Sequence, residues 1–246
     1  MKKLSFYSLA IIFMMFTSCA SAQFKLPKVN LPKPTTSTGI NTGRPSDTEV
    51  ANGLKEALIQ GTTKGTAQAS QTNGYYGNSL IRIPFPPEIK KVETTLRNVG
   101  MGSEVDKFVL SLNRAAEDAA ISAKPIFISA IKSLTIKDVW NILTGEKDAA
   151  TQYLKRTTSA QLTTSFKPII QNSLDKVNAT KYYGTLITSY NKIPMVQKVN
   201  PDLNAYATDK AITGLFTLVA QEEANIRENP IARTTDLLKR VFGYKG

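Results

Sequence analysis

The side chains best suited to chemistry lie in a stretch whose other residues favour burial. The segment "NRAAEDAA" places Asn113, Arg114 and Glu117 in an alanine-rich part of a helix predicted over residues 103–123. At 100° per residue, Asn113 and Glu117 flank the main apolar stripe, whereas Arg114 interrupts a second apolar line on the opposite side. Helices that are apolar on two sides are usually central in a bundle. We therefore expect Arg114 to be partly buried and to need a carboxylate partner.

The acidic residues that match this arginine lie on a second helix, predicted over residues 202–229. Both Glu222 and Glu223 fall within the apolar arc of that helix instead of opposite it. Glu223 can pair with Arg227 four residues later, which is the favourable order for a helical ion pair, whereas Glu222 has no comparable local partner. We predict that Glu222 or Glu223 meets Arg114 in one interior polar cluster. The predicted members of this cluster are Asn113, Arg114, Glu117, Lys124, Glu222, Glu223 and Arg227.

Three uses are open to such a cluster. It is an ion-pair network that sets the register of the helices, a polar pocket for a ligand, or a catalytic site built on carboxylates. Two glutamates with an arginine and a lysine are compatible with acid–base chemistry, but they also occur in inert cores. We favour the ion-pair network. In the catalytic alternative, the candidate residues are Glu117, Glu222 and Glu223.

Absent residue types exclude several chemistries. The chain contains no histidine, and Cys19 is its single cysteine. Without histidine there is no Ser-His-Asp or Cys-His triad and no zinc site that depends on imidazole. Any catalysis would rely on carboxylates, lysine, tyrosine or Ser-Lys chemistry, and any metal would be a hard cation bound by oxygen. We predict no metal site and no cofactor.

The N-terminus has the pattern of a signal peptide. Two lysines precede an apolar run over residues 4–16, which is followed by small residues. The string "FTSC" resembles a bacterial lipobox in which Cys19 is lipidated and becomes the mature N-terminus, although phenylalanine replaces the more usual leucine. The string "ASA" that follows Cys19 equally fits ordinary secretion. We favour a lipoprotein signal peptide over residues 1–18, because the only cysteine stands directly after the apolar run and two small residues.

A tether is predicted next, over residues 19–45. This segment is rich in Pro, Thr, Ser, Gly and Asn and has no hydrophobic period. Such a composition is typical of a disordered linker, long enough to hold a domain away from a membrane. A tether directly after a lipid-attachment cysteine is a coherent arrangement, so it supports the lipoprotein interpretation.

Residues 46–246 are predicted to form an all-α domain, a single multi-helix bundle. Capping patterns at "SDTE" and "TIKD" open two of its helices, and prolines make residues 79–87 extended. Asp148 is predicted to cap a helix through Leu154, and Ser159 to open a separate helix through Val177. No alternating strand pattern and no internal repeat is found, and about 200 residues are enough for a substantial core. The predicted helices begin near residues 46, 87, 103, 125, 135, 148, 159, 179, 202 and 235.

The chain is strongly basic. Its formal net charge is +12, and the loss of Lys2 and Lys3 with the signal peptide reduces it to +10. Behind a signal peptide, this excess favours anionic lipid headgroups, envelope polysaccharide or an acidic protein as partners, and no nucleic acid is expected. A generally basic, solvated surface explains the charge equally well, because the lysines and arginines are scattered.

A series of short strings also occurs in a characteristic order: "LKEAL", "IRIPFP", "NRAAEDAA", "AKPIF", "ILTG", "AATQYL", "LTTSFKPI", "DKAITGLF", "EEANIRENP" and "LLKRVFG". This series resembles domain-of-unknown-function family 4197, a family of exported or lipid-attached bacterial proteins. The resemblance covers about residues 50–243, nearly the whole folded part. It implies a helical envelope protein and carries over no activity and no site residues.

These features predict a non-enzymatic bacterial envelope lipoprotein whose helical domain binds a partner protein or an anionic envelope ligand. The expected partners are the membrane, through the lipid anchor at Cys19, and that protein or ligand. Ala20 in place of an aspartate resembles the pattern of outer-membrane lipoproteins, so we expect a location facing the periplasm; a secreted or soluble periplasmic protein is the alternative. The alternative function is a carboxylate-dependent hydrolase or lyase that acts on an envelope polymer, with Glu222 or Glu223 working with Glu117.

Overall fold

The computed structural model describes residues 45–192, 194–195 and 197–243. Within these ranges it contains nine α-helices, two short 3-10 helices and no strand, so the predicted all-α class is confirmed. The predicted signal peptide, the lipidation residue Cys19 and nearly all of the predicted tether lie outside the described residues. The helices are α1 (Asp47–Ser70), η1 (Pro87–Ile89), α2 (Lys90–Asn98), α3 (Gly102–Ala120), α4 (Ala123–Lys132), α5 (Ile136–Leu143), α6 (Ala149–Asp175), α7 (Ala179–Tyr190), α8 (Leu203–Glu228), η2 (Pro230–Ala232) and α9 (Asp236–Gly243).

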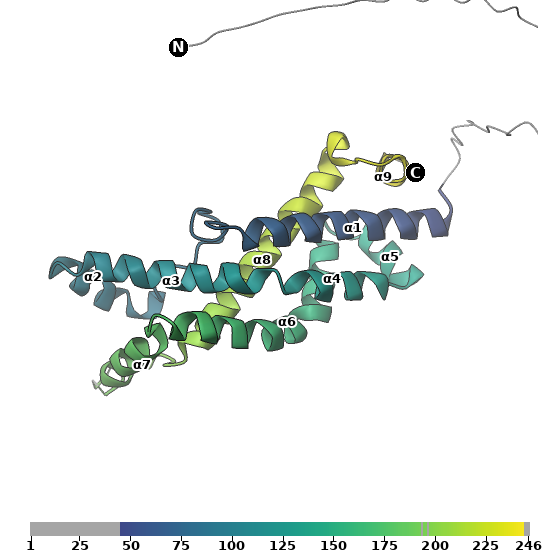
Figure 1. Cartoon of the computed structure of the whole chain (residues 1–246). Coiled ribbons are helices and arrows are strands. Elements are labelled where there is room, and N and C mark those ends of the chain that lie inside the picture. The colour runs from purple at the N-terminus through teal and green to yellow at the C-terminus, as the bar shows by residue number, and fades with distance from the viewer. Residues whose placement is uncertain (1–44, 193, 196, 244–246) are drawn as a thin grey trace, which may run out of the picture. The chain divides into compact units, whose positions relative to one another are not determined.

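One helix layer and one crossing helix form the core. In Figure 1, α1, the pair α3 and α4, and α6 run side by side, and α8 crosses behind all three and contacts each of them. The short helices pack on this frame: α2 folds back along α3, α7 follows α6, and α9 packs on α1. Because α8 touches three layer helices, it buries residues on several sides, among them Ala207, Ala211, Leu215 and Leu218. This arrangement makes α8 the central helix of the domain.

The two capping boxes predicted from the sequence are found at the helix ends. Ser46 and Glu49 form a capping box at the start of α1, and Thr135 and Asp138 form another at the start of α5. In both boxes the two side chains bond each other's backbone N–H groups, which the first helical turn leaves without a partner. At α8, the Asp202 carboxylate accepts a hydrogen bond from an N–H of the first turn. These local patterns therefore mark the N-terminal ends of α1, α5 and α8.

The prediction of two separate helices over residues 148–177 is wrong, because α6 is continuous. The hydroxyl of Ser159 does not cap a new helix; it donates to the carbonyl oxygen of Lys155, one turn earlier. Thr158 and Thr163 donate in the same way to carbonyl oxygens four residues back, which satisfies the hydroxyls without ending the helix. A buried residue at every fourth position keeps one face of α6 in the core: Ala150, Leu154, Thr158, Leu162, Phe166, Ile170 and Leu174.

An irregular segment, residues 71–86, connects α1 to η1 and packs into the core through Tyr75. The Tyr75 side chain is fully buried, and its hydroxyl donates a 2.6 Å hydrogen bond to the carbonyl oxygen of Ala211 in α8. Burial raises the pKa of Tyr75 far above its usual range, so the hydroxyl remains a donor. The ring fits against α8 at Gly214, where a Cβ atom would lie 2.8 Å from Tyr75 Cε1.

Gly214→Ala is expected to lower the free energy of unfolding by about 1–3 kcal/mol, because the added methyl group overpacks the contact with Tyr75. Gly184→Ala in α7 is the matched control, since a Cβ there meets nothing within 4 Å. It is expected to stabilise the helix by up to about 1 kcal/mol. Urea unfolding followed by circular dichroism measures both variants, and effects of the same sign would contradict this account of the packing.

Candidate functional site

The predicted polar cluster is in fact two clusters on different helices. Arg114 donates hydrogen bonds to Glu117 on its own helix and to Oδ1 of Asn73 (2.9 Å). Glu223 bonds Arg227 and the start of α6. The prediction that Arg114 meets Glu222 or Glu223 is therefore wrong, whereas the predicted pair of Glu223 with Arg227 is confirmed. The remaining predicted member, Lys124, makes no side-chain hydrogen bond or ion pair with either cluster among the described residues.

The first cluster, which we call the loop clamp, consists of Asn113, Arg114 and Glu117. Oε1 of Glu117 accepts hydrogen bonds from the N–H groups of Tyr75 and Tyr76, both at 3.1 Å. Asn113 is fully buried and bonds both the N–H and the carbonyl oxygen of one residue of the extended segment, Ile83, at 2.8 Å each. A buried irregular segment has no ladder to satisfy its backbone groups, so side chains have to do so. The loop clamp holds residues 71–86 against α3 in this way.

The second cluster, which we call the helix cap, consists of Glu223 and Arg227. The Glu223 carboxylate accepts hydrogen bonds from the N–H groups of Ala150 (3.0 Å) and Thr151 (2.8 Å) in the first turn of α6. Arg227 bonds Glu223 through two nitrogens and also donates to the last turn of α5 at the carbonyl oxygen of Ile142 (2.9 Å). A carboxylate from α8 therefore replaces the predicted cap of Asp148, whose side chain bonds Gln152 instead.

Glu222 belongs to neither cluster. Its carboxylate pairs with the Lys64 ammonium group at 2.7 Å and so connects α8 to α1. The lysine side chain is 62% exposed, which makes this a solvated pair. Pairs of this kind contribute at most about 1 kcal/mol to stability.

The three candidate catalytic carboxylates have structural partners. Both oxygens of Glu117 and both oxygens of Glu223 accept hydrogen bonds from backbone N–H groups or arginines. The cavity beside Glu223 and Arg227 has a volume of only about 20 Å³, room for about one water molecule. Among the described residues, no group of three or more His, Cys, Asp or Glu side chains is placed to hold a metal ion. This geometry does not support acid–base catalysis by these three glutamates.

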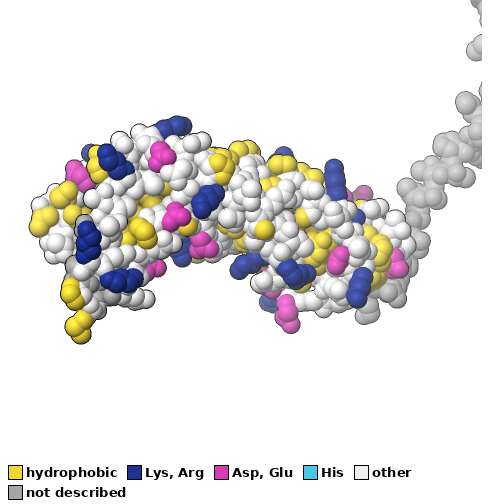
Figure 2. Space-filling view, turned by 90° about the horizontal axis from the view of Figure 1, so that it is seen from below, with side chains coloured by type: hydrophobic (Ala, Val, Ile, Leu, Met, Phe, Trp, Pro, Cys, Tyr) yellow, Lys and Arg dark blue, Asp and Glu magenta, His cyan; other side chains and the backbone are white. Residues whose placement is uncertain are grey.

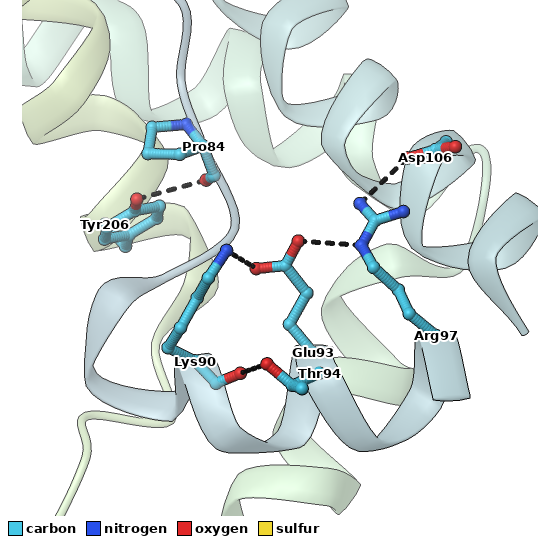
Figure 3. Close-up of polar contacts among 7 residues, drawn as sticks. All are labelled: Pro84, Lys90, Glu93, Thr94, Arg97, Asp106 and Tyr206. Atoms are coloured by element: carbon cyan, nitrogen blue, oxygen red, sulfur yellow. Dashed lines mark hydrogen bonds and ion pairs between the residues drawn. The ribbon is translucent and has the colours of Figure 1, made fainter. Parts of the chain in front are cut away.

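A further buried carboxylate, Glu93, escaped the sequence analysis. Figure 3 shows Glu93 between Lys90 and Arg97, at 2.6 and 3.0 Å, with Arg97 also bonded to Asp106 of α3 at 2.9 Å. Burial alone would raise the pKa of Glu93, but the hydrogen bonds from Lys90 and Arg97 outweigh it and lower the pKa. The spacing of three and four residues around Glu93 was the signal available in the sequence. The cluster fastens α2 to α3, and both carboxylate oxygens of Glu93 accept hydrogen bonds within it.

An open groove lies between α3, the end of α6 and the start of α7. Its volume is about 890 Å³, within the range typical of ligand sites. Phe108, which lines the groove, stacks on Tyr183 of α7 with ring centroids 6.1 Å apart. Burial, with a contribution from nearby Glu88, raises the pKa of Tyr183 to about 12, so its hydroxyl stays neutral at physiological pH. The other apolar or aromatic lining residues are Met101, Leu110, Val177, Ala179 and Tyr182.

Charged side chains of both signs surround this apolar lining. The cationic ones are Lys107, Arg114 and Lys176, and the acidic ones are Glu104 and Asp118. Ser173 donates a 2.6 Å hydrogen bond to Asp118, and Arg114 is held by Glu117. The two lysines form no ion pair among the described residues. Figure 2 shows hydrophobic and basic side chains side by side at the end of the molecule that carries α2 and α7.

Comparison with known proteins gives one match. The model of the family described as "Protein of unknown function (DUF4197)" matches residues 44–243. No curated protein and no solved structure matches the chain.

Glu223→Ala is expected to lower the free energy of unfolding by about 3–5 kcal/mol, because it leaves Arg227 and the first turn of α6 buried without a partner. Glu222→Ala removes the neighbouring carboxylate of the solvated pair and is expected to cost less than about 1 kcal/mol. Urea unfolding of both variants measures the difference. A similar loss of unfolding free energy for the two variants would show that the contacts of Glu223 stabilise the protein no more than the solvated pair does.

Proposed function

Because the chain belongs to the DUF4197 family, whose description states no activity, its role has to follow from its own geometry, and we propose that it is a non-enzymatic envelope protein that binds an anionic amphiphile. The groove between α3, α6 and α7 holds the acyl chain of this ligand. The lysines at its rim attract the anionic head. The groove is the observation that carries the proposal.

The lining of the groove favours an acyl chain over a small polar ligand. Its wall is formed mainly by apolar and aromatic side chains, including Leu110 and Val177, and its floor rests on the stacked rings of Phe108 and Tyr183. Each methylene group that leaves water for such an environment contributes about 0.8 kcal/mol. An acyl chain of ten or so carbons therefore contributes about 8 kcal/mol when it is fully buried, and the cost of association offsets at least about 4 kcal/mol of it. Micromolar binding also requires charge-assisted hydrogen bonds from the two rim lysines to the head, at about 1.5–3 kcal/mol each.

The charges at the rim favour an anionic head. Lys107 and Lys176 line the groove without an ion pair among the described residues, so their ammonium groups are available to a ligand. The net charge of the whole chain is +12, or +10 without Lys2 and Lys3, so its surface attracts anions on average. Glu104 and Asp118 carry negative charge at the same rim, so the preference for an anionic head depends on the two lysines together with the positive net charge of the chain.

Laurate is expected to bind the full chain in the micromolar range, and Ser111→Trp to weaken binding at least tenfold by filling the groove with an indole ring. Ser111 lies on α3 in the wall of the groove. Ser129→Trp places the same ring on the exposed side of α4 and is expected to leave binding unchanged. Isothermal titration measures both, with dodecyl maltoside as the uncharged comparison. Millimolar laurate binding, or equal weakening by the two tryptophans, would contradict the proposal.

The place of the protein in the cell is the second part of the proposal. We place it at the outer membrane, facing the periplasm and anchored through a lipid on Cys19, with a secreted or soluble periplasmic form as the alternative. The support is the signal pattern of the first residues together with the absence of other cysteines. Among the described helices, none combines the length and the apolar character needed to span a bilayer.

Mass spectrometry of the mature protein is expected to find an acylated N-terminal Cys19. Cys19→Ser blocks the attachment of lipid and is expected to move the protein from the membrane fraction to the soluble fraction. A mature N-terminus at Gln23 without lipid would replace the anchored form by the secreted one, and it would leave the laurate site untouched.

A further inference from the structure

We infer that α7 and the described residues on either side of it, 176–192, 194–195 and 197–198, form a docking surface for bilayers that contain anionic lipid. This inference goes beyond the proposed function, because it requires neither a ligand in the groove nor a lipid on Cys19. It rests on the charge, the exposed apolar side chains and the orientation of this segment.

The charge of the segment has a single sign. Residues 176–200 contain four lysines and neither aspartate nor glutamate. All four lysines are exposed, and none of them forms an ion pair among the described residues. Asp175, the acidic residue just before the segment, is bonded by Gln171 and Thr180. These hydrogen bonds lower the pKa of Asp175, so it stays ionised. The segment therefore carries four positive charges against this one neighbouring carboxylate: Lys176, Lys181, Lys192 and Lys198.

Exposed apolar side chains lie among these lysines. Val177 is 54% exposed, Tyr182 is 68% exposed, and Met195 is fully exposed. Tyr183 and Ile187 of the same helix are buried in the core, so the opposite side of α7 has to face outward. Met195 has a positive φ of 66°, which a non-glycine residue adopts in tight turns. Lysine combined with tyrosine and flexible apolar side chains is typical of segments that lie at the boundary of headgroups and acyl chains.

The basic side chains of the segment, all of them lysines, favour lipid over nucleic acid or an acidic protein as the partner. Residues 176–200 contain no arginine, the side chain that recognises phosphate and carboxylate groups through two parallel hydrogen bonds. Lysines act as point charges that need no fixed partner geometry, which suits a fluid layer of headgroups. A fully exposed Met195 gains little from a nucleic-acid backbone but buries its side chain in a bilayer.

The docking surface borders the groove. Lys176, Val177 and Tyr182 belong to the segment and also line the groove. Docking through α7 therefore brings the groove next to the bilayer, where an amphiphile is found. Figure 2 shows this end of the molecule with its apolar and basic side chains exposed together.

Vesicle flotation tests the inference with the mature chain, residues 19–246, carrying Cys19→Ser, so that neither a lipid anchor nor the apolar run over residues 4–16 contributes. We expect binding to vesicles of equal parts phosphatidylcholine and phosphatidylglycerol, and no binding to phosphatidylcholine alone. Lys181→Gln with Lys192→Gln is expected to lower the partition coefficient about fivefold per lysine, which corresponds to about 1 kcal/mol each. Met195→Ser is expected to lower it further without changing its dependence on salt. None of these three residues lines the groove.

Matched variants elsewhere serve as controls. Lys137→Gln with Lys155→Gln removes the same charge from α5 and α6, and Ile231→Ser removes an exposed apolar side chain from η2. These variants are expected to bind vesicles as the unmodified chain does. Equal weakening by the controls, or no binding to the anionic vesicles, overturns the docking surface; the latter result together with binding of an acidic protein would assign the segment to that partner. If the unmodified chain binds anionic vesicles but does not bind laurate, only the proposed function is overturned.

Discussion

A buried carboxylate that accepts two consecutive backbone N–H groups is the interaction on which this fold depends. Glu117 does this for the irregular segment between α1 and η1, and Glu223 does it for the first turn of α6. In both cases an arginine from the same helix compensates the charge and donates a further hydrogen bond, to Asn73 of the same irregular segment or to Ile142 at the end of α5. Buried N–H groups without an acceptor would cost several kcal/mol in total, so the central helices α3 and α8 each supply one.

The same constraint separates the residues that hold the fold together from the residues that line the groove. Glu117 and Glu223, two of the three candidate carboxylates, hold backbone N–H groups, whereas the groove is lined by apolar side chains and by charged residues of both signs. Arg114 connects the two regions. Its guanidinium bonds Glu117 and Asn73, yet the side chain is 38% exposed and lines the groove. One residue of the loop clamp is thus also part of the groove wall.

The sequence predicted the helical class, most helix boundaries and the presence of buried charge. Among the partners of that charge it predicted Arg227 for Glu223, but not the backbone N–H groups. Capping boxes at Ser46 and Thr135 are local patterns, and local patterns can be recognised from spacing alone. Glutamates on an apolar arc show that a partner exists. They do not show whether it is a guanidinium or a backbone N–H, because every residue except proline offers an N–H group. Ser159 illustrates the same limit: its hydroxyl can cap a helix or bond back to Lys155, and only the continuous buried face of α6 decides between them. The groove was not predicted, since it arises where α3 meets the junction of α6 and α7, which lies far from α3 in the sequence.

The position of α7 couples the two surfaces for which we propose binding. Its inner face is fastened by Tyr183, whose ring stacks on Phe108 in the groove, and by the buried Ile187. Its exposed face carries Tyr182 and Lys181. Tyr182 and the neighbouring Lys176 and Val177 line the groove and also belong to the docking surface. Because a bilayer and a ligand contact the same side chains, we expect docking and ligand binding to influence each other.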